Sequence, residues 1–142
     1  YTLSLHDALP ICATDGQPAP QIPADPDRLA QVLDNLLDNA IRHAGPGTGI
    51  TVEITASGAG AECSVRDRGA GIPAEHLPFI FERFYRVDKS RQRTSGGTGL
   101  GLAIARALIQ AMGGRIWAES VAGQGTSITF WLPKVDAQLP SS

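Results

Sequence analysis

Four short motifs rich in asparagine and glycine follow one another along this chain of 142 residues. They are Asn-Leu-Leu-Asp-Asn-Ala at residues 35–40, Asp-Arg-Gly-Ala-Gly at 67–71, Gly-Thr-Gly-Leu-Gly-Leu at 97–102 and Gly-Gln-Gly-Thr at 123–126. A carboxamide can bind a hydrated cation, a carboxylate can accept a hydrogen bond from an amine, and glycine-flanked backbone amides can bind phosphate. Together these chemistries predict a nucleotide site.

The first motif lies on a helix that is predicted to begin at Asp25, because Asp caps helix N-termini and Pro26 follows in the first turn. Apolar residues then recur at spacings of three and four, which predicts one buried stripe. Asn35, Asn39 and Arg42 fall beside that stripe on one polar face. Two Asn residues a turn apart are unfavourable inside a helix, so they indicate a ligand site, with a merely solvated face as the alternative. The stripe comprises Leu29, Val32, Leu33, Leu36, Leu37, Ala40 and Ile41.

The second motif begins with Asp67, which ends a predicted strand at residues 62–67 that follows another at 50–56. Gly69 and Gly71 would let the backbone approach a ligand closely. A carboxylate here can accept a hydrogen bond from the exocyclic amine of adenine, whereas guanine presents a carbonyl, so Asp67 would select ATP over GTP. The alternative is an Asp-x-Gly turn that only closes a hairpin. The other three motifs favour the nucleotide site.

Two segments of different character precede the third motif. Residues 75–85 carry apolar side chains at helical spacing and are predicted to form a short helix. Residues 86–97 form a loop with more basic than acidic residues. Such a loop is usually a solvated surface, but beside a triphosphate it could fold over the phosphates as a lid.

The glycines of the third motif open a helix that is predicted to run to about Met112, and free N–H groups at a helix start can bind an anion. The motif is not a Walker loop, and it is not a dinucleotide fingerprint because Leu102 replaces the third glycine. Strands at 115–119 and 126–132 follow, joined by the fourth motif. In the last strand the residues expected to point inward are Ile128, Phe130 and Leu132, and those expected to point outward are Thr129 and Trp131.

The chain is expected to contain one folded domain, at residues 25–133. Residues 1–24 are expected to lie outside it, as a non-native or linker segment in which residues 1–11 resemble the translation of a sequencing adapter. Residues 134–142 are expected to form a disordered polar tail.

The composition disfavours several classes of function. The net charge of −2 gives no indication of nucleic-acid or membrane-surface binding. No apolar run approaches the roughly 18 residues that span a bilayer. Two cysteines, Cys12 and Cys63, are too few for a disulfide framework or a zinc site, so a reducing cytoplasm is expected.

Taken in order, the motifs resemble those of the ATP-binding catalytic domain of bacterial sensor histidine kinases, within the superfamily of gyrase-type, chaperone and mismatch-repair ATPases. The resemblance covers roughly residues 25–133. It implies an α+β fold of the Bergerat type, in which a mixed β-sheet packs against about three helices in a two-layer sandwich with an ATP lid. It also implies ATP and Mg²⁺ as ligands.

The same resemblance assigns roles to individual residues. Asn39 would bind Mg²⁺, Arg42 and Arg86 would lie near the phosphates, His43 near the ribose-phosphate side, and Thr126 near the adenine pocket. The implied ATP-binding residues are Asn35, Asn39, Arg42, His43, Asp67, Gly69, Gly71, Ile72, Tyr85, Arg86, Thr98, Gly99, Leu100, Gly101, Leu102 and Thr126.

No catalytic residue is expected within this chain. In the resembling family, hydrolysing members and anti-sigma-type serine kinases have a Glu base where this chain has Asn35, and a carboxamide cannot take up a proton. The resemblance therefore implies phosphoryl transfer to a histidine on a separate dimerisation domain of the same kinase, for relay to the receiver domain of a response regulator. The fragment alone would be inactive, at the cytoplasmic end of a membrane-anchored sensor.

Two other functions stay open. A regulatory ATP-binding module without transfer activity is one, although the intact Asn39, Asp67 and glycine motifs favour the kinase. An anti-sigma-type serine kinase is the other, and Asn35 disfavours it. His6 is not expected to be the phosphoacceptor, because too few residues separate it from Asn35 for the two-helix hairpin of the family.

Overall fold

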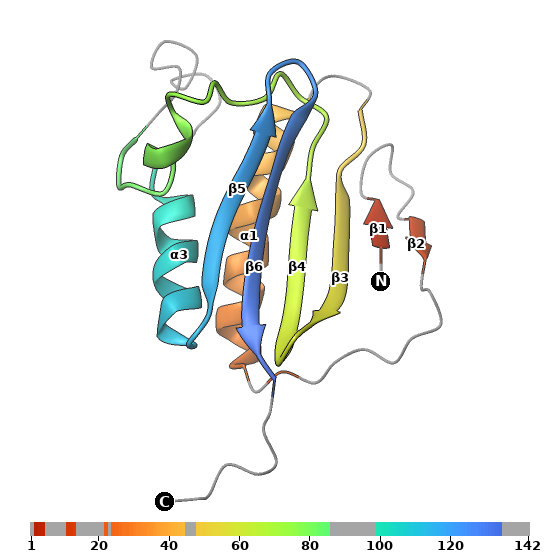
Figure 1. Ribbon diagram of the computed structural model, residues 1–142, viewed down its shortest axis with the longest axis vertical. Helices are drawn as coiled ribbons and strands as arrows, with labels where there is room; N and C mark the ends of the chain where they lie inside the picture. Colours follow the sequence, from red (N-terminus) through yellow and green to blue (C-terminus); the bar gives the residue numbers. More distant parts are fainter. Residues whose placement is uncertain are drawn as a thin grey trace, which may run out of the picture.

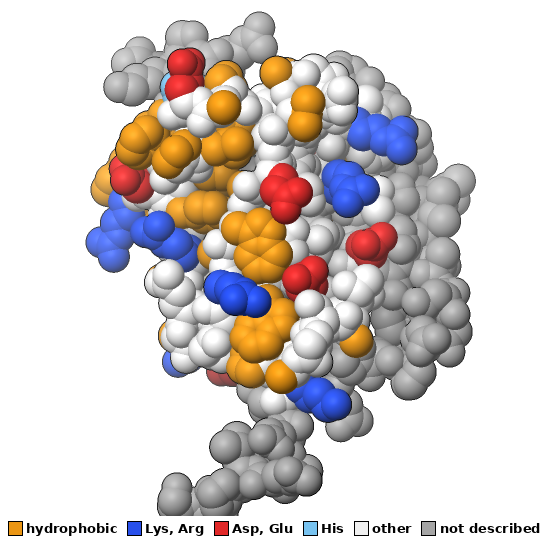
Figure 2. All heavy atoms as spheres, viewed as in Figure 1, with side chains coloured by type: hydrophobic (Ala, Val, Ile, Leu, Met, Phe, Trp, Pro, Cys, Tyr) orange, Lys and Arg blue, Asp and Glu red, His pale blue; other side chains and the backbone are white. Residues whose placement is uncertain are grey.

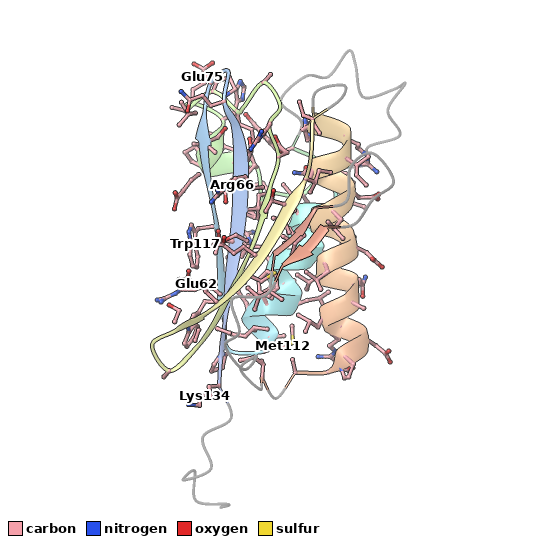
Figure 3. The ribbon with its side chains drawn as sticks, turned by 90° about the vertical axis from the view of Figure 1, so that its right-hand side faces the viewer. Glu62, Arg66, Glu75, Met112, Trp117 and Lys134 are labelled. Carbon is pink, nitrogen blue, oxygen red and sulfur yellow. The ribbon has the colours of Figure 1, made fainter. Side chains whose placement is uncertain are left out.

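A computed structural model describes residues 2–4, 11–13, 22, 24–44, 48–85 and 99–134 of the chain. A β-sheet forms one layer, and helices α1 (Pro26–His43) and α3 (Gly101–Ala111) form the other, on one face of the sheet (Figure 1). Figure 3 shows the two layers from the side. The strands are β1 (Thr2–Ser4), β2 (Ile11–Ala13), β3 (Thr51–Ser57), β4 (Gly60–Arg66), β5 (Arg115–Val121) and β6 (Gly125–Pro133).

The sheet has the strand order β2-β1-β3-β4-β6-β5, and every described pair of neighbouring strands is antiparallel. The fold is therefore α+β, but the prediction of a mixed sheet was wrong. Strands β4 and β5 do point the same way, and α3 lies between them in the sequence, which is the pattern of a parallel crossover. They are not neighbours, because β6 returns antiparallel from β5 and pairs with both of them.

The sheet continues past β3 into the first residues of the chain. The backbone of β1 pairs with the outer edge of β3, with Thr2 opposite Glu53, and β2 pairs in turn with β1. Both short strands fall within the segment that was expected to lie outside the domain. Their pairing covers an edge of β3 that would otherwise present free N–H and C=O groups.

Helix α1 begins as its sequence predicts. The Asp25 side chain accepts a hydrogen bond of 2.9 Å from the N–H of Asp27, and Pro26 occupies the first turn. The apolar stripe packs against the sheet, with Val32, Leu36 and Ala40 buried, except at its end, where the prediction was wrong because Ile41 is 61% exposed. The helix is too polar elsewhere to be buried on all sides, and no described helix is both long and apolar enough to cross a membrane.

The core lies between the sheet and the two helices. The predicted alternation in β6 is confirmed, since Ile128, Phe130 and Leu132 are buried on the helix side of the sheet. Cys63 of β4 joins them, and its burial raises the pKa of the thiol to about 12. This cysteine is therefore a neutral core residue at physiological pH.

The face of the sheet turned away from the helices carries hydrophobic, basic and acidic side chains side by side (Figure 2). The guanidinium of Arg115 lies over the rings of Trp117 and Trp131, at 6.0 Å and 5.2 Å from their centroids. Thr129 points to this face as predicted, yet it is buried there and hydrogen-bonds to Ser64 Oγ at 2.8 Å. In the side view Trp117 lies on the side of the sheet opposite α1 (Figure 3).

The short helix predicted at residues 75–85 is not formed. The structure has a single 3-10 turn, η1 (Leu77–Phe79), followed by irregular turns up to Tyr85. Pro78 lacks the N–H that an α-helix needs, and Phe84 has a φ of 64°, in the left-handed region that a right-handed helix excludes. The described residues thus contain two α-helices and one 3-10 turn instead of about three helices. The expected lid, residues 86–97, lies outside the described residues.

Replacing Leu36 by Ala should lower the free energy of unfolding by about 2–5 kcal/mol, because a buried leucine leaves a cavity that the surrounding core fills only in part. Leu36 is 1% exposed, between α1 and the sheet. Ile41→Ala on the same helix is the matched control, since Ile41 is 61% exposed. Urea unfolding followed by circular dichroism measures both. Equal losses in the two variants would contradict the assigned core.

Candidate nucleotide-binding site

Asp67 follows directly after β4 and is 3% exposed. Its Oδ1 accepts hydrogen bonds from the N–H groups of Gly69, at 2.8 Å, and Thr126, at 3.3 Å. Its own N–H donates to the carbonyl of Thr126 at 2.9 Å. These bonds fix the carboxylate at the junction of β4 and β6, and among the described residues none donates to its second oxygen. Asp67 can therefore accept a hydrogen bond from a ligand.

The loop after Asp67 is enclosed by backbone on two sides. A Cβ on Gly69 would lie 1.8 Å from the carbonyl oxygen of His43, at the end of α1. Gly71 has a φ of 80°, and a Cβ there would lie 2.5 Å from the carbonyl oxygen of Val121. The two glycines are required because only a residue without a side chain allows these approaches. They bring Asp67, Thr126 and the end of α1 together.

Ser120 is a residue of this region that the sequence analysis missed. Its Oγ accepts a hydrogen bond from the N–H of Ile72 at 2.6 Å, and it contacts the carbonyl of Gly125 and the Oγ1 of Thr126 at 3.0 Å each. Ser120 lies on the same face of β5 as the apolar residues Ile116 and Ala118. A polar residue at the end of an apolar alternation was the feature of the sequence that could have indicated it. Its hydroxyl joins the loop after β4 to the β5–β6 hairpin.

A second part of the site lies where α1 meets α3. The Nδ2 of Asn35 is buried without a hydrogen-bond partner among the described residues. A Cβ on Gly101, the first residue of α3, would lie 3.9 Å from the Cβ of Asn35. Because a buried donor without an acceptor is costly, this amide fits an anionic ligand such as a phosphate oxygen.

The other residues of the third motif occupy the start of α3. Leu100 is the N-cap residue, and its carbonyl accepts the N–H of Ile104 at 2.9 Å. Leu102 is partly buried and packs against the core. Thr98 lies outside the described residues, and Gly99 is held against Phe84, whose N–H donates to the Gly99 carbonyl at 2.8 Å. This bond links two described residues that flank the segment 86–98.

Asn39 and Arg42 lie further along α1. Asn39 is partly exposed. Arg42 pairs with Asp38 of the preceding turn, with 3.5 Å between Nη2 and Oδ2, and both side chains are substantially exposed. Among the described residues no group of three or more His, Cys, Asp and Glu side chains could hold a metal ion.

Tyr85 is directed elsewhere. Its hydroxyl hydrogen-bonds to Nδ1 of His76, and its ring lies 5.7 Å from that of Phe79. Within the described residues these contacts tie Tyr85 to the turn around η1 and not to Asp67 or Asn35. Arg86, the next residue, lies outside the described residues.

His43 ends α1 beside Asp67 and keeps part of its surface exposed. Desolvation lowers the pKa of His43 below its usual value of 6.5, the charge of Asp67 opposes this, and Arg42 lowers the pKa further. Desolvation and Arg42 therefore favour the neutral imidazole, whereas the charge of Asp67 favours the imidazolium.

A family model described as "Histidine kinase-, DNA gyrase B-, and HSP90-like ATPase" matches residues 24–136. The chain belongs to this family. Sensor histidine kinase WalK of Bacillus subtilis (strain 168) is 47% identical over 116 residues, which are 80% of this chain and 19% of WalK. The chain thus spans about a fifth of the length of that relative.

Two solved structures of similar proteins agree with this assignment. The mycobacterial sensor histidine kinase MprB is 32% identical with a TM-score of 0.70, and the match covers 80% of this chain and 77% of that one. Full-length ShkA in complex with AMPPNP is 35% identical with a TM-score of 0.72, over 85% of this chain and 24% of that one. This HATPase domain is homologous to the ATP-binding catalytic domain of sensor histidine kinases, which confirms the resemblance seen in the sequence.

Asp67→Asn should lower the pKa of His43 further, because it removes the negative charge that favours the imidazolium. The replacement keeps an oxygen that can accept from Gly69 and Thr126, so the loop is expected to persist. An NMR titration of the His43 ring measures the pKa in both proteins. Glu62→Gln, on the outer face of the sheet, is the control and should leave the pKa unchanged. An unchanged or raised pKa in Asp67→Asn would contradict the electrostatic contact.

Proposed function

We propose that this domain binds Mg-ATP and donates the γ-phosphoryl group to a histidine on a separate dimerisation domain of the same kinase, for relay to the receiver domain of a response regulator. The observation that carries the proposal is the buried carboxylate of Asp67, which has one oxygen engaged by backbone N–H groups and one without a described donor. An amine on the ligand would complete its hydrogen bonds.

Adenine is the base that fits this carboxylate. Its 6-amino group donates, whereas guanine has a carbonyl oxygen in that place and would be repelled by an ionised acceptor. Thr126 is 4% exposed and lies beside Asp67. Gly71 and Ile72 belong to the loop that follows Asp67. The adenine end of the nucleotide would therefore lie between this loop and the end of α1, near His43.

The phosphates would lie toward the start of α3. The unpartnered amide of Asn35 beside Gly101 supports this, because it supplies a donor where a phosphate oxygen needs one. Asn39 is the residue we assign to Mg²⁺. A carboxamide, with no acidic cluster among the described residues, suits an ion that keeps much of its water and binds chiefly through the nucleotide phosphates. Arg42, Arg86 and Thr98 remain phosphate-side assignments from the family resemblance.

The domain is proposed to supply positioning and charge compensation and not the base or the nucleophile. Asn35 occupies the position where hydrolysing relatives have a Glu, and a carboxamide cannot accept a proton. Asp38, the nearby acid on α1, is exposed and paired with Arg42. Phosphoryl transfer needs little covalent participation from the protein, so a partner domain that presents a histidine would complete the reaction.

We propose a cytoplasmic location for the domain, since ATP and response regulators are cytoplasmic. We also propose residues 25–133 as the functional unit. A regulatory module that binds ATP without transferring phosphate is the second candidate. Among the described residues, one oxygen of Asp67 has no donor and the amide of Asn35 has no acceptor, which favours an intact site in either case. Only an assay of transfer therefore separates the two candidates.

Asp67→Asn should weaken ATP binding by about 1.5–3 kcal/mol, the range for a hydrogen bond to a charged group, and reduce the preference for ATP over GTP. The new amide would present a donor to the donor on adenine. Titrations of labelled ATP and GTP against both proteins measure this, with Glu62→Gln as a control carboxylate far from the site. Equal ATP affinities in Asp67→Asn and the unchanged protein would exclude the adenine assignment.

The domain alone should neither label itself with phosphate nor hydrolyse ATP appreciably, because a positioned base typically contributes about 10²–10⁴-fold in rate and none is expected here. Addition of a histidine-bearing helical hairpin from a cognate kinase should give a phosphohistidine that is acid-labile and base-stable. Incubation with γ-labelled ATP, with and without the hairpin, decides between the candidates. Acid-stable label would indicate a serine kinase, and binding without any transfer would support the regulatory module.

A further inference from the structure

Among the described residues, the hydroxyl of Ser120 has three hydrogen-bond partners but only one proton to donate. Three polar groups lie within hydrogen-bond distance of its Oγ: the N–H of Ile72, the carbonyl of Gly125 and the hydroxyl of Thr126. A serine hydroxyl donates once and accepts twice. All three contacts are satisfied together only if Ser120 accepts from Ile72, donates to Gly125 and accepts from Thr126. In that arrangement the proton of Thr126 points at Ser120.

The direction of that proton decides what Thr126 offers to a ligand. A threonine hydroxyl that donates to Ser120 has only lone pairs left, so it can act toward the nucleotide as an acceptor and not as a donor. Thr126 is 4% exposed, and its backbone N–H contacts the carboxylate of Asp67 at 3.3 Å. The hydroxyl and the carboxylate are thus anchored to the same short stretch of backbone.

We infer that Ser120 is a positioning residue for base recognition, which holds the Thr126 hydroxyl as a second acceptor beside Asp67. The inference rests on the proposed adenine site. The 6-amino group of adenine has two hydrogens, and two acceptors on one side of the pocket match both of them. A base with a carbonyl at this position, or with no substituent, would leave both buried acceptors without a donor, which is costly. Ser120 therefore increases the selectivity for adenine through Thr126, without itself contacting the base.

The test compares ATP with purine riboside triphosphate, which lacks the 6-amino group and is otherwise the same. The ratio of their dissociation constants measures what the amine contributes. Ser120→Ala and Thr126→Val should each lower this ratio by roughly 2- to 12-fold, the effect of losing one neutral hydrogen bond. The double variant should show no further decrease beyond Thr126→Val, because Ser120 acts through Thr126.

Ser64→Ala is the matched control. Ser64 also hydrogen-bonds to a threonine of β6, Thr129, at 2.8 Å, but on the outer face of the sheet. Its loss should change stability to a similar extent and leave the ratio unchanged. Thermal unfolding of each variant shows whether the fold is retained, and Ser120→Thr, which keeps the hydroxyl, should retain more of the ratio than Ser120→Ala.

The outcomes separate this inference from the proposed function. If Ser120→Ala weakens both nucleotides equally, the residue only supports the loop and the inference is wrong. The inference is also wrong if Thr126→Val leaves the ratio unchanged while Asp67→Asn lowers it, and in that case the adenine site stands. Failure of the unchanged protein to bind ATP would instead overturn the proposed function.

Discussion

The burial of one carboxylate governs the geometry of this domain's site. Asp67 is almost fully removed from water, and a buried charge is tolerated only when hydrogen bonds compensate it. The N–H groups of Gly69 and Thr126 provide these bonds, and they come from parts of the chain far apart in sequence. To deliver them, the loop must lie against the end of α1 and the turn after β5, where only glycine fits at positions 69 and 71. Gly69 and Gly71 are therefore required to hold Asp67, and in the proposed site they would contribute to ligand recognition through Asp67.

Features with local causes were predictable from the sequence. The Asp25 cap, the apolar stripe of α1 and the alternation in β6 each depend on neighbouring residues, and the structure has all three, apart from Ile41 at the end of the stripe, which is exposed. Features that depend on distant pairing were not predictable in the same way. The insertion of β6 between β4 and β5 made the sheet antiparallel, and no local pattern encodes that order. The expected helix at 75–85 failed for a local reason that apolar spacing alone overlooks, namely Pro78 and the left-handed Phe84.

The residues of the candidate site differ in the same way: some were predictable from local motifs, and others depend on packing between distant parts of the chain. Asp67, Gly69, Gly71 and Thr126 were found from their motifs, and the structure brings them together. Ser120 was missed because a serine in a strand has no chemical signature until its partners are known, and those partners are set by the register of the β5–β6 hairpin. The buried, unpartnered amide of Asn35 likewise emerges only from the packing of α1 against the start of α3. The type of a side chain predicts which hydrogen bonds it could make, whereas its burial determines whether those bonds are required.

The proposed function requires the domain to position a phosphoryl group and leaves the attack to another domain. Transfer of this kind depends mainly on alignment and on compensation of charge, so rigid support matters more than a reactive side chain. Contacts between described residues supply such support on both sides of the segment 86–98. The bond from Phe84 N–H to the Gly99 carbonyl links two described residues that flank the segment 86–98, and the contact of Tyr85 with His76 ties the residue before that segment to η1. Tyr85 and Gly99 are therefore each held by a described neighbour outside that segment. In the proposed site, a phosphate at the start of α3 would meet a helix that is anchored in the core through Leu102, Ala105 and Ile109.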